Sequence, residues 1–333
     1  MKFKSVIFIN LIILQVLIVI FLSVQIYKKS RTALKTISVS PIKKEVIGFN
    51  SSGKLKYFYE PTSNTKEVIR PPWLKNKAVY TINSDALNER FNYSVKKPTH
   101  IFRIITLGDS FTFGDYVSTE KNYVEQLEDL LNNNKNCSIS HRFEVINLGV
   151  RGYDIQYSVE RFRIRGQKYD PDLVIWFLKD DDFDQINEVT LPIINQYLAN
   201  LKEKGLFDEL SEKGTKETFF KAYQAGINAQ QKKYSNESIL DYQKKSLEEF
   251  NNNYKDQLVV FTFSNIKFEY KSVLKNYVRL HKNAYFFDAI SNIHDHNDEF
   301  LFPYDYHPSL KGHQIIAQEL FNYLINNKII PCN

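Results

Sequence analysis

One short stretch, residues 103–115, constrains the fold of this chain more than any other. Its sequence, RIITLGDSFTFGD, begins with apolar, β-prone residues and stops at Gly108-Asp109-Ser110. An aromatic segment and an amphipathic pattern follow. This order predicts a strand, a tight turn and the first turn of a helix. A serine at such a turn has its hydroxyl at the carboxyl edge of a sheet, where ligands of open α/β sheets bind. Its backbone N–H points out of a helix N-terminus, where an anion is stabilised.

Ser110 has a second, simpler interpretation as the N-cap of that helix, a common role for serine. The turn alone favours the cap. A catalytic role additionally requires a second donor for an oxyanion and a base further along the chain.

From residue 102 onward, strand-like runs alternate with amphipathic stretches. This alternation predicts a mostly parallel sheet with helices on both faces. Strands are expected at 102–107, 143–148, 172–178, 258–263 and 284–290, and the last helix at 311–326. Residues 186–256 are polar and helix-prone, and we interpret them as a long helical excursion near the strand edge and as a candidate lid.

Composition narrows the class of protein. A chain of 333 residues with 43% hydrophobic residues is large enough for one full core plus extensions. The net charge of +6 comes from scattered lysines among acidic residues, without a basic block, which does not favour nucleic-acid binding. Cys137 and Cys332 exclude a disulfide-rich scaffold and a cysteine-based zinc site. They allow one disulfide in an extracytoplasmic domain, which the sequence leaves open.

Residues 6–26 form an almost unbroken apolar run, long enough to cross a bilayer as a helix. The run is longer than the apolar part of most signal peptides and no small-x-small site follows it, so we predict an uncleaved signal anchor. A count of the flanking lysines and arginines slightly favours a cytoplasmic body. Long domains, however, translocate largely regardless of nearby charge. We therefore expect a single-pass membrane protein with its amino end inside and its body outside.

Three further loops carry residues suited to chemistry. In NLGVRGYDIQ, Gly149 and Gly152 follow a strand, and the N–H of Gly152 is a candidate second anion donor; the alternative is an ordinary strand-to-helix loop. In LKDDDFDQ, four aspartates indicate a solvated, helix-capping acidic loop; a divalent-metal site is the alternative, but their spacing matches no calcium loop. Near the carboxyl end, Asp305 stands two residues before His307 and is placed to orient its imidazole.

The other histidine motifs are weaker candidates. We expect His313 to pack at the start of the last helix. The HDHND motif at residues 294–298 is more typical of a polar loop than of a metal site, and we predict no metal ligands.

Together these blocks resemble the SGNH/GDSL hydrolase family over residues 102–324. GDSFTFG resembles its first block, with Ser110 at the nucleophile. NLGVRG resembles the second, with Gly152 at the oxyanion glycine. DYHPSLKGH resembles the last, with His307 at the base and Asp305 at its orienting acid. TINSDALNERF also resembles the lead-in of many bacterial members. The resemblance implies a three-layer α/β/α, flavodoxin-like hydrolase domain that needs no metal or organic cofactor.

Two positions depart from the family pattern. The third block usually supplies an asparagine that donates to the oxyanion, and that position falls on Asp181. A carboxylate there would repel the developing charge unless it is protonated or turned away. Losing one such donor costs about 10²–10³ in rate. The acid usually stands three residues before the histidine, at Tyr304 here, but Asp at two before occurs in a subset that includes enzymes acting on exopolysaccharide acyl groups.

These observations predict a membrane anchor at 1–35, a stalk with a strand-and-loop apron at 36–100, and an SGNH-type hydrolase domain at 101–330 with a helical insertion at about 186–256. The expected activity is hydrolysis of an O-acyl ester, above all an O-acetyl group on a surface glycan, through a Ser-His-Asp triad and an acyl-enzyme. The alternatives are an O-acyltransferase with the same triad, a catalytically silent glycan-binding module, and a structural membrane protein.

Overall fold

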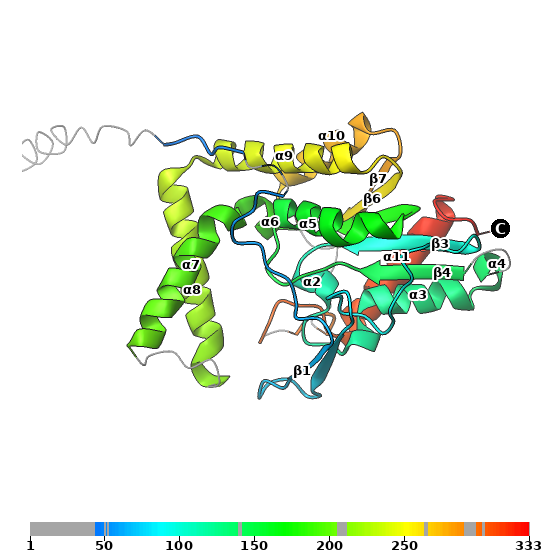
Figure 1. Cartoon of the computed structure of the whole chain (residues 1–333), viewed down its shortest axis with the longest axis horizontal. Coiled ribbons are helices and arrows are strands. Elements are labelled where there is room, and N and C mark those ends of the chain that lie inside the picture. Colours follow the sequence, from blue (N-terminus) through cyan, green and yellow to red (C-terminus); the bar gives the residue numbers. More distant parts are fainter. Residues whose placement is uncertain are drawn as a thin grey trace, which may run out of the picture. The chain divides into compact units, whose positions relative to one another are not determined.

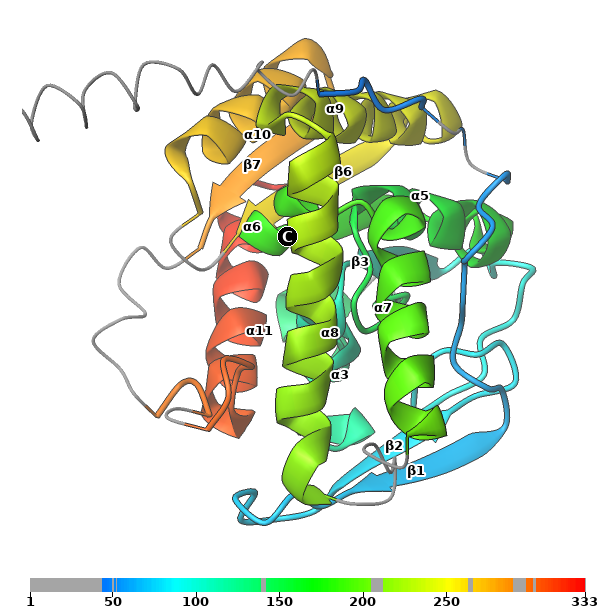
Figure 2. The same cartoon turned by 90° about the vertical axis from the view of Figure 1, so that its left-hand side faces the viewer.

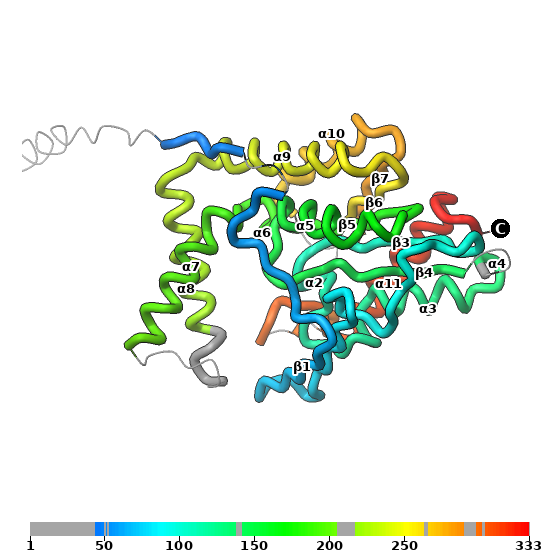
Figure 3. Tube along the Cα trace, in the orientation of Figure 1, coloured from blue at the N-terminus to red at the C-terminus, as the bar shows by residue number. Residues whose placement is uncertain are grey.

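The computed structural model divides the chain into Met1–Lys44 and Glu45–Asn333. It describes residues 44–49, 51, 53–138, 142–204, 212–262, 266–289, 298–301 and 304–332, which Figure 3 traces in colour. Within these ranges we find no helix with the length and apolar character needed to cross a membrane. The span predicted at residues 6–26 lies outside them.

A five-stranded parallel sheet forms the centre of the second unit. Its strands are β3 (Ile101–Leu107), β4 (Arg142–Asn147), β5 (Leu173–Phe177), β6 (Gln257–Thr262) and β7 (Ala284–Asp288). The strand order is β4-β3-β5-β6-β7, and every neighbouring pair is parallel. All five strands expected from the sequence are present, and the order is that of flavodoxin-like folds.

Helices cover both faces of this sheet (Figure 1). One face carries α3 (Tyr123–Asn133) and α11 (Leu310–Asn326), and the other carries α5 (Ile155–Arg161), α9 (Asn236–Asn253) and α10 (Phe268–Leu280). Consecutive residues of a strand point to opposite faces. Accordingly, Ile104 packs in the first layer and Ile105 in the second. The predicted last helix is confirmed as α11.

A small antiparallel ribbon precedes the sheet. It consists of β1 (Thr65–Ile69) and β2 (Ala78–Ile82), which pair antiparallel. Tyr80 of β2 packs edge-on against Phe113 at a centroid distance of 5.2 Å, and the Asn88 amide donates to the Phe113 carbonyl at 2.8 Å. The ribbon therefore rests on the turn that follows β3.

Only part of the helical insertion predicted at residues 186–256 projects from the sheet. The helices α7 (Asn187–Glu203) and α8 (Glu212–Lys233) lie side by side as a hairpin (Figures 1 and 2). In contrast, α9 places Leu247 and Phe250 in the core beside Trp176 of β5. Polar residues between its apolar ones hid this buried face in the sequence.

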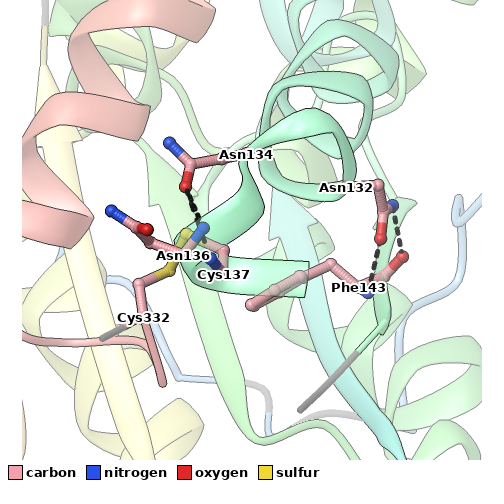
Figure 4. Close-up of a disulfide and its surroundings, with 6 residues drawn as sticks. All are labelled: Asn132, Asn134, Asn136, Cys137, Phe143 and Cys332. Carbon is pink, nitrogen blue, oxygen red and sulfur yellow. Dashed lines mark hydrogen bonds between the residues drawn. A yellow bond between two sulfur atoms is a disulfide. The ribbon is translucent and has the colours of Figure 1, made fainter. Parts of the chain in front are cut away.

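A disulfide joins Cys137 to Cys332, which answers the question that the sequence left open (Figure 4). It links α4 (Lys135–Ser138), which follows α3, to the tail that follows α11. In the same region the Asn132 side chain exchanges two hydrogen bonds of 2.9 Å with the backbone of Phe143. The remaining described elements are the short helices α2 (Ser110–Phe113) and α6 (Asp180–Asp184) and the helical turns η1 (Thr119–Lys121), η2 (Phe162–Gly166) and η3 (Gln167–Tyr169).

Candidate active site

Ser110, His307 and Asp305 form one continuous series of hydrogen bonds. The Nε2 atom of His307 lies 2.7 Å from the Ser110 hydroxyl oxygen, and its Nδ1 atom lies 2.5 Å from Oδ1 of Asp305. Asp305 is buried, and the same Oδ1 also accepts the backbone N–H of His307 at 3.1 Å. Three side chains singled out in the sequence thus lie within hydrogen-bonding distance, although 195 residues separate Ser110 from Asp305.

The local sequence explains how Ser110 is held. It is the first residue of α2 (Ser110–Phe113), directly after β3, and Asp109 is the N-cap of this helix because its Oδ1 accepts the Phe111 N–H at 2.9 Å. The capping role considered for Ser110 is therefore performed by Asp109. The Ser110 hydroxyl is left to face His307.

Two aromatic rings pack against the imidazole of His307. Phe111 lies 5.0 Å away and Tyr116 lies 5.3 Å away, measured between ring centroids. Burial raises the pKa of the Tyr116 phenol well above its ordinary value, and the nearby Asp305 carboxylate, with which it is hydrogen-bonded, raises it further. The phenol is therefore a neutral donor to Asp305 at neutral pH.

The glycine loop after β4 packs directly on the serine turn. Val150 donates its N–H to the Gly108 carbonyl at 3.2 Å, and a Cβ on Gly149 would lie 2.4 Å from the backbone nitrogen of Phe113. Only glycine permits that approach. Gly152 has a φ of +71°, and its carbonyl accepts the Asn187 amide at 2.8 Å. The backbone of Gly152 is thus anchored from α7, a contact that the sequence did not suggest.

Asp181 lies in α6 (Asp180–Asp184), which follows β5 at the same sheet edge. Its side chain is 63% exposed and forms an ion pair with the ammonium group of Lys179. Lys179 also lies 3.1 Å from Asp109, measured from Nζ to Oδ2. The segment after β5 therefore contributes two paired side chains, the carboxylate of Asp181 and the ammonium group of Lys179. The sequence alone indicated no role for Lys179.

A second ion pair joins the first and second blocks. The Arg151 guanidinium pairs with Asp115 and stacks 4.7 Å above the ring of Phe113. Asp115 in turn lies 3.8 Å from Nε2 of His307, measured from Oδ2. Both residues stand inside motifs singled out in the sequence, so the charges were visible there, but their pairing was not.

The remaining histidine prediction is confirmed. His313 is fully buried in the first turn of α11 and its Nδ1 accepts the Tyr123 N–H at 3.2 Å. Burial lowers the pKa of His313 to about 3, with a smaller contribution from His307, so its imidazole is neutral and structural.

Metal binding was also considered for the acidic loop. In the part of the chain that the structure describes, no group of three or more His, Cys, Asp or Glu side chains is arranged to hold a metal ion. Asp180 accepts the Lys267 N–H at 2.8 Å and Asp182 accepts the Lys179 N–H at 2.7 Å, as expected for capping carboxylates. Four of the five residues of HDHND lie outside the described ranges.

A match to a family model gives the class of protein. Residues 104–320 match the family model described as GDSL-like Lipase/Acylhydrolase, and the chain belongs to this SGNH/GDSL hydrolase family. It is accordingly an ester hydrolase of the GDSL type. No curated protein matches the sequence.

The solved structures similar to the chain include three that are carbohydrate-directed esterases by name. A two-domain esterase active on acetylated mannans is 16% identical, with 70% of this chain and 52% of that chain covered and a TM-score of 0.42. The chain thus spans about half the length of that esterase. An acetyl xylan esterase from Geobacillus stearothermophilus is 17% identical, with 69% and 96% covered and a TM-score of 0.41. A Clostridium thermocellum family 3 carbohydrate esterase is 15% identical, with 68% and 96% covered and a TM-score of 0.38.

Proposed function

We propose that the chain is a serine esterase that hydrolyses an O-acyl ester, above all an O-acetyl group on a cell-surface or extracellular glycan. The observation that carries this proposal is the hydrogen-bonded series from Ser110 through His307 to Asp305. A nucleophile, a base and a carboxylate that orients the base are the groups that acyl transfer through a covalent intermediate requires.

In the proposed reaction, the Ser110 hydroxyl oxygen attacks the ester carbonyl carbon while its proton passes to Nε2 of His307. Asp305 accepts the Nδ1–H bond and stabilises the imidazolium that forms. The tetrahedral intermediate then expels the alcohol, which takes the proton from His307 and leaves the acyl group on Ser110. Water attacks this acyl-enzyme with His307 again as base, releasing the carboxylic acid and restoring the serine.

The backbone N–H groups of Ser110 and Gly152 are the proposed oxyanion donors. Ser110 is the first residue of α2, whose N-terminal N–H groups carry partial positive charge. The loop contacts between Val150 and Gly108 hold the second block close to that turn. Asp181, at the position of the usual asparagine, is not expected to donate as a carboxylate.

A group of aromatic side chains near His307, in which Tyr304 is exposed and Trp73 and Tyr116 are half-buried, supports a substrate that contains a sugar ring. Trp73 stacks on Tyr304 at a centroid distance of 5.9 Å and meets Tyr116 at 4.9 Å. Tyr304 is 58% exposed and directly precedes Asp305. The apolar face of a pyranose ring is suited to such aromatic surfaces.

We also propose that residues 6–26 anchor the protein as a single-pass membrane helix, with the catalytic domain outside the cytoplasm. The Cys137–Cys332 disulfide supports this location, because disulfides persist in oxidising compartments.

The test is hydrolysis of an aryl acetate and of an acetylated oligosaccharide by the wild type, Ser110→Ala and a control, Ser272→Ala. Ser272 is half-buried in α10, where its hydroxyl donates to the Phe268 carbonyl at 2.8 Å, and it belongs neither to the triad nor to the proposed oxyanion donors. We expect Ser110→Ala to abolish turnover and the control to retain it. Full activity in Ser110→Ala would refute the proposal, whereas transfer of the acetyl group to an added sugar in preference to water would reassign the chain as an acyltransferase.

A further inference from the structure

The position of Asp181 raises an electrostatic problem for the proposed reaction. In the family pattern this position donates an amide hydrogen bond to the oxyanion, whereas a carboxylate would repel the same charge. In the structure the Asp181 carboxylate is not isolated, because it forms an ion pair with Lys179 at the start of the same loop.

Lys179 occupies an unusual position for a lysine. Its side chain is only 14% exposed, and its ammonium nitrogen lies 3.1 Å from Oδ2 of Asp109 and 5.3 Å from the ring centroid of Phe111. Asp109 and Phe111 are the residues immediately before and after Ser110. One positive charge therefore lies beside the turn that carries Ser110 and connects this turn to α6, which contains Asp181.

The surrounding charges favour the protonated form of this lysine. Burial alone would lower the pKa of Lys179, but the carboxylates of Asp109, Asp181 and Asp182 raise it above its ordinary value. The backbone N–H of Lys179 also donates to Asp182 at 2.7 Å, which fixes the start of the loop. The ammonium group is thus charged and held in place before any substrate binds, as electrostatic stabilisation requires.

We propose that Lys179 is a positioning residue for the esterase reaction. Its ammonium group neutralises Asp181 and Asp109 beside the acyl oxygen that gains negative charge, and so offsets the loss of the usual asparagine donor. This inference rests on the esterase function proposed above.

The test is a set of four variants: Lys179→Met, Lys179→Arg, Asp181→Asn and the double variant Lys179→Met/Asp181→Asn. We expect Lys179→Met to lower kcat by about tenfold to a hundredfold with little change in KM, because a charge acting on the transition state is lost. Asp181→Asn should keep or raise kcat, and Lys179→Arg should retain most of it. The double variant should recover much of the loss, since the unpaired carboxylate is gone.

A matched control is Lys97→Met. Lys97 is also half-buried and ion-paired, with its Nζ 2.7 Å from Oδ1 of Asp172. We expect the Lys97→Met variant to have the same kcat as the wild type. If Lys179→Met does not fold, Lys179→Gln replaces it in both the single and the double variant. This substitution also removes the charge, but it keeps a hydrogen-bond donor for Asp109.

Two outcomes would overturn the inference: an unchanged kcat in Lys179→Met, or a double variant as slow as Lys179→Met alone. The second outcome would assign Lys179 a purely structural role. Retained activity in Ser110→Ala would instead overturn the esterase proposal itself, so the two failures are distinguishable.

Discussion

At the scale of single residues, the sequence carried most of the candidate site. Ser110, Gly152, Asp305 and His307 each stand in a motif whose spacing is local, so they were recognisable without a structure. The pairing of Asp181 with Lys179 was not, because an ion pair depends on how side chains turn within a loop. Asn187 was missed for a related reason: its contact with Gly152 joins the start of α7 to a loop 35 residues earlier in the chain.

Asp305 provides the clearest prediction at this scale. Asp305→Asn keeps the size of the side chain but removes the charge that stabilises the imidazolium of His307. We expect kcat to fall by about 10³–10⁴-fold with the fold unchanged. The measurement is steady-state kinetics of Asp305→Asn and of a control variant, Asp129→Asn. Asp129 is an exposed carboxylate that pairs with Arg90. A loss of less than tenfold would mean that Asp305 does not orient the base.

At the scale of elements, a buried acidic cluster joins the segment after β2 to α3 and β4. Glu89, Glu125 and Glu128 are all buried, and Arg90 forms ion pairs with Glu125 and Glu128. Glu89 is hydrogen-bonded to Glu125, and two carboxyl groups bond in this way only when they share a proton. Burial, followed by the charge of Glu125, raises the pKa of Glu89 well above its ordinary value, and burial raises that of Glu128 to about 7.

This cluster makes the stability of the fold depend on pH. Because the folded state keeps a proton that the unfolded state releases, the contribution of this cluster to the free energy of unfolding is largest below about pH 4.5. It then falls as the pH rises through the folded-state pKa values, by about 1.4 kcal/mol per pH unit for each proton. Glu89→Gln mimics the protonated side chain, so we expect a flatter pH profile and higher stability than wild type at pH 8.

Denaturant unfolding between pH 5 and pH 8 measures this effect. The exposed Glu120 offers the control, since Glu120→Gln should leave the slope as it is in the wild type. An identical slope in Glu89→Gln would show that Glu89 does not carry the bound proton.

At the scale of the whole molecule, the sequence predicted the parallel sheet and its last helix because both have strong hydrophobic periodicity. The packing of α9 against the sheet was not evident, because its buried face includes Tyr242, Gln243 and Ser246 beside the apolar residues. The disulfide was likewise undecided, since two cysteines 195 residues apart give no local signal of pairing.

The disulfide leads to a prediction about the whole chain. Cys137 and Cys332 join α4 to the tail after α11, and neither segment carries a side chain of the candidate site. We expect Cys332→Ser to lower the free energy of unfolding by about 2–4 kcal/mol while kcat stays the same. Thermal unfolding with and without a reducing agent tests this, and a melting temperature that does not respond to reduction in the wild type would contradict it.

The central claim is that Ser110 is an activated nucleophile, and covalent labelling tests it most directly. The body of the protein, from about residue 36, would be treated with a fluorophosphonate, and the adduct would be located by mass spectrometry of its peptides. We expect one adduct, on Ser110, that is absent from Ser110→Ala and forms much more slowly in Asp305→Asn. A folded wild-type protein that takes no label, or takes it on another residue, would contradict the account and favour a catalytically silent binding module.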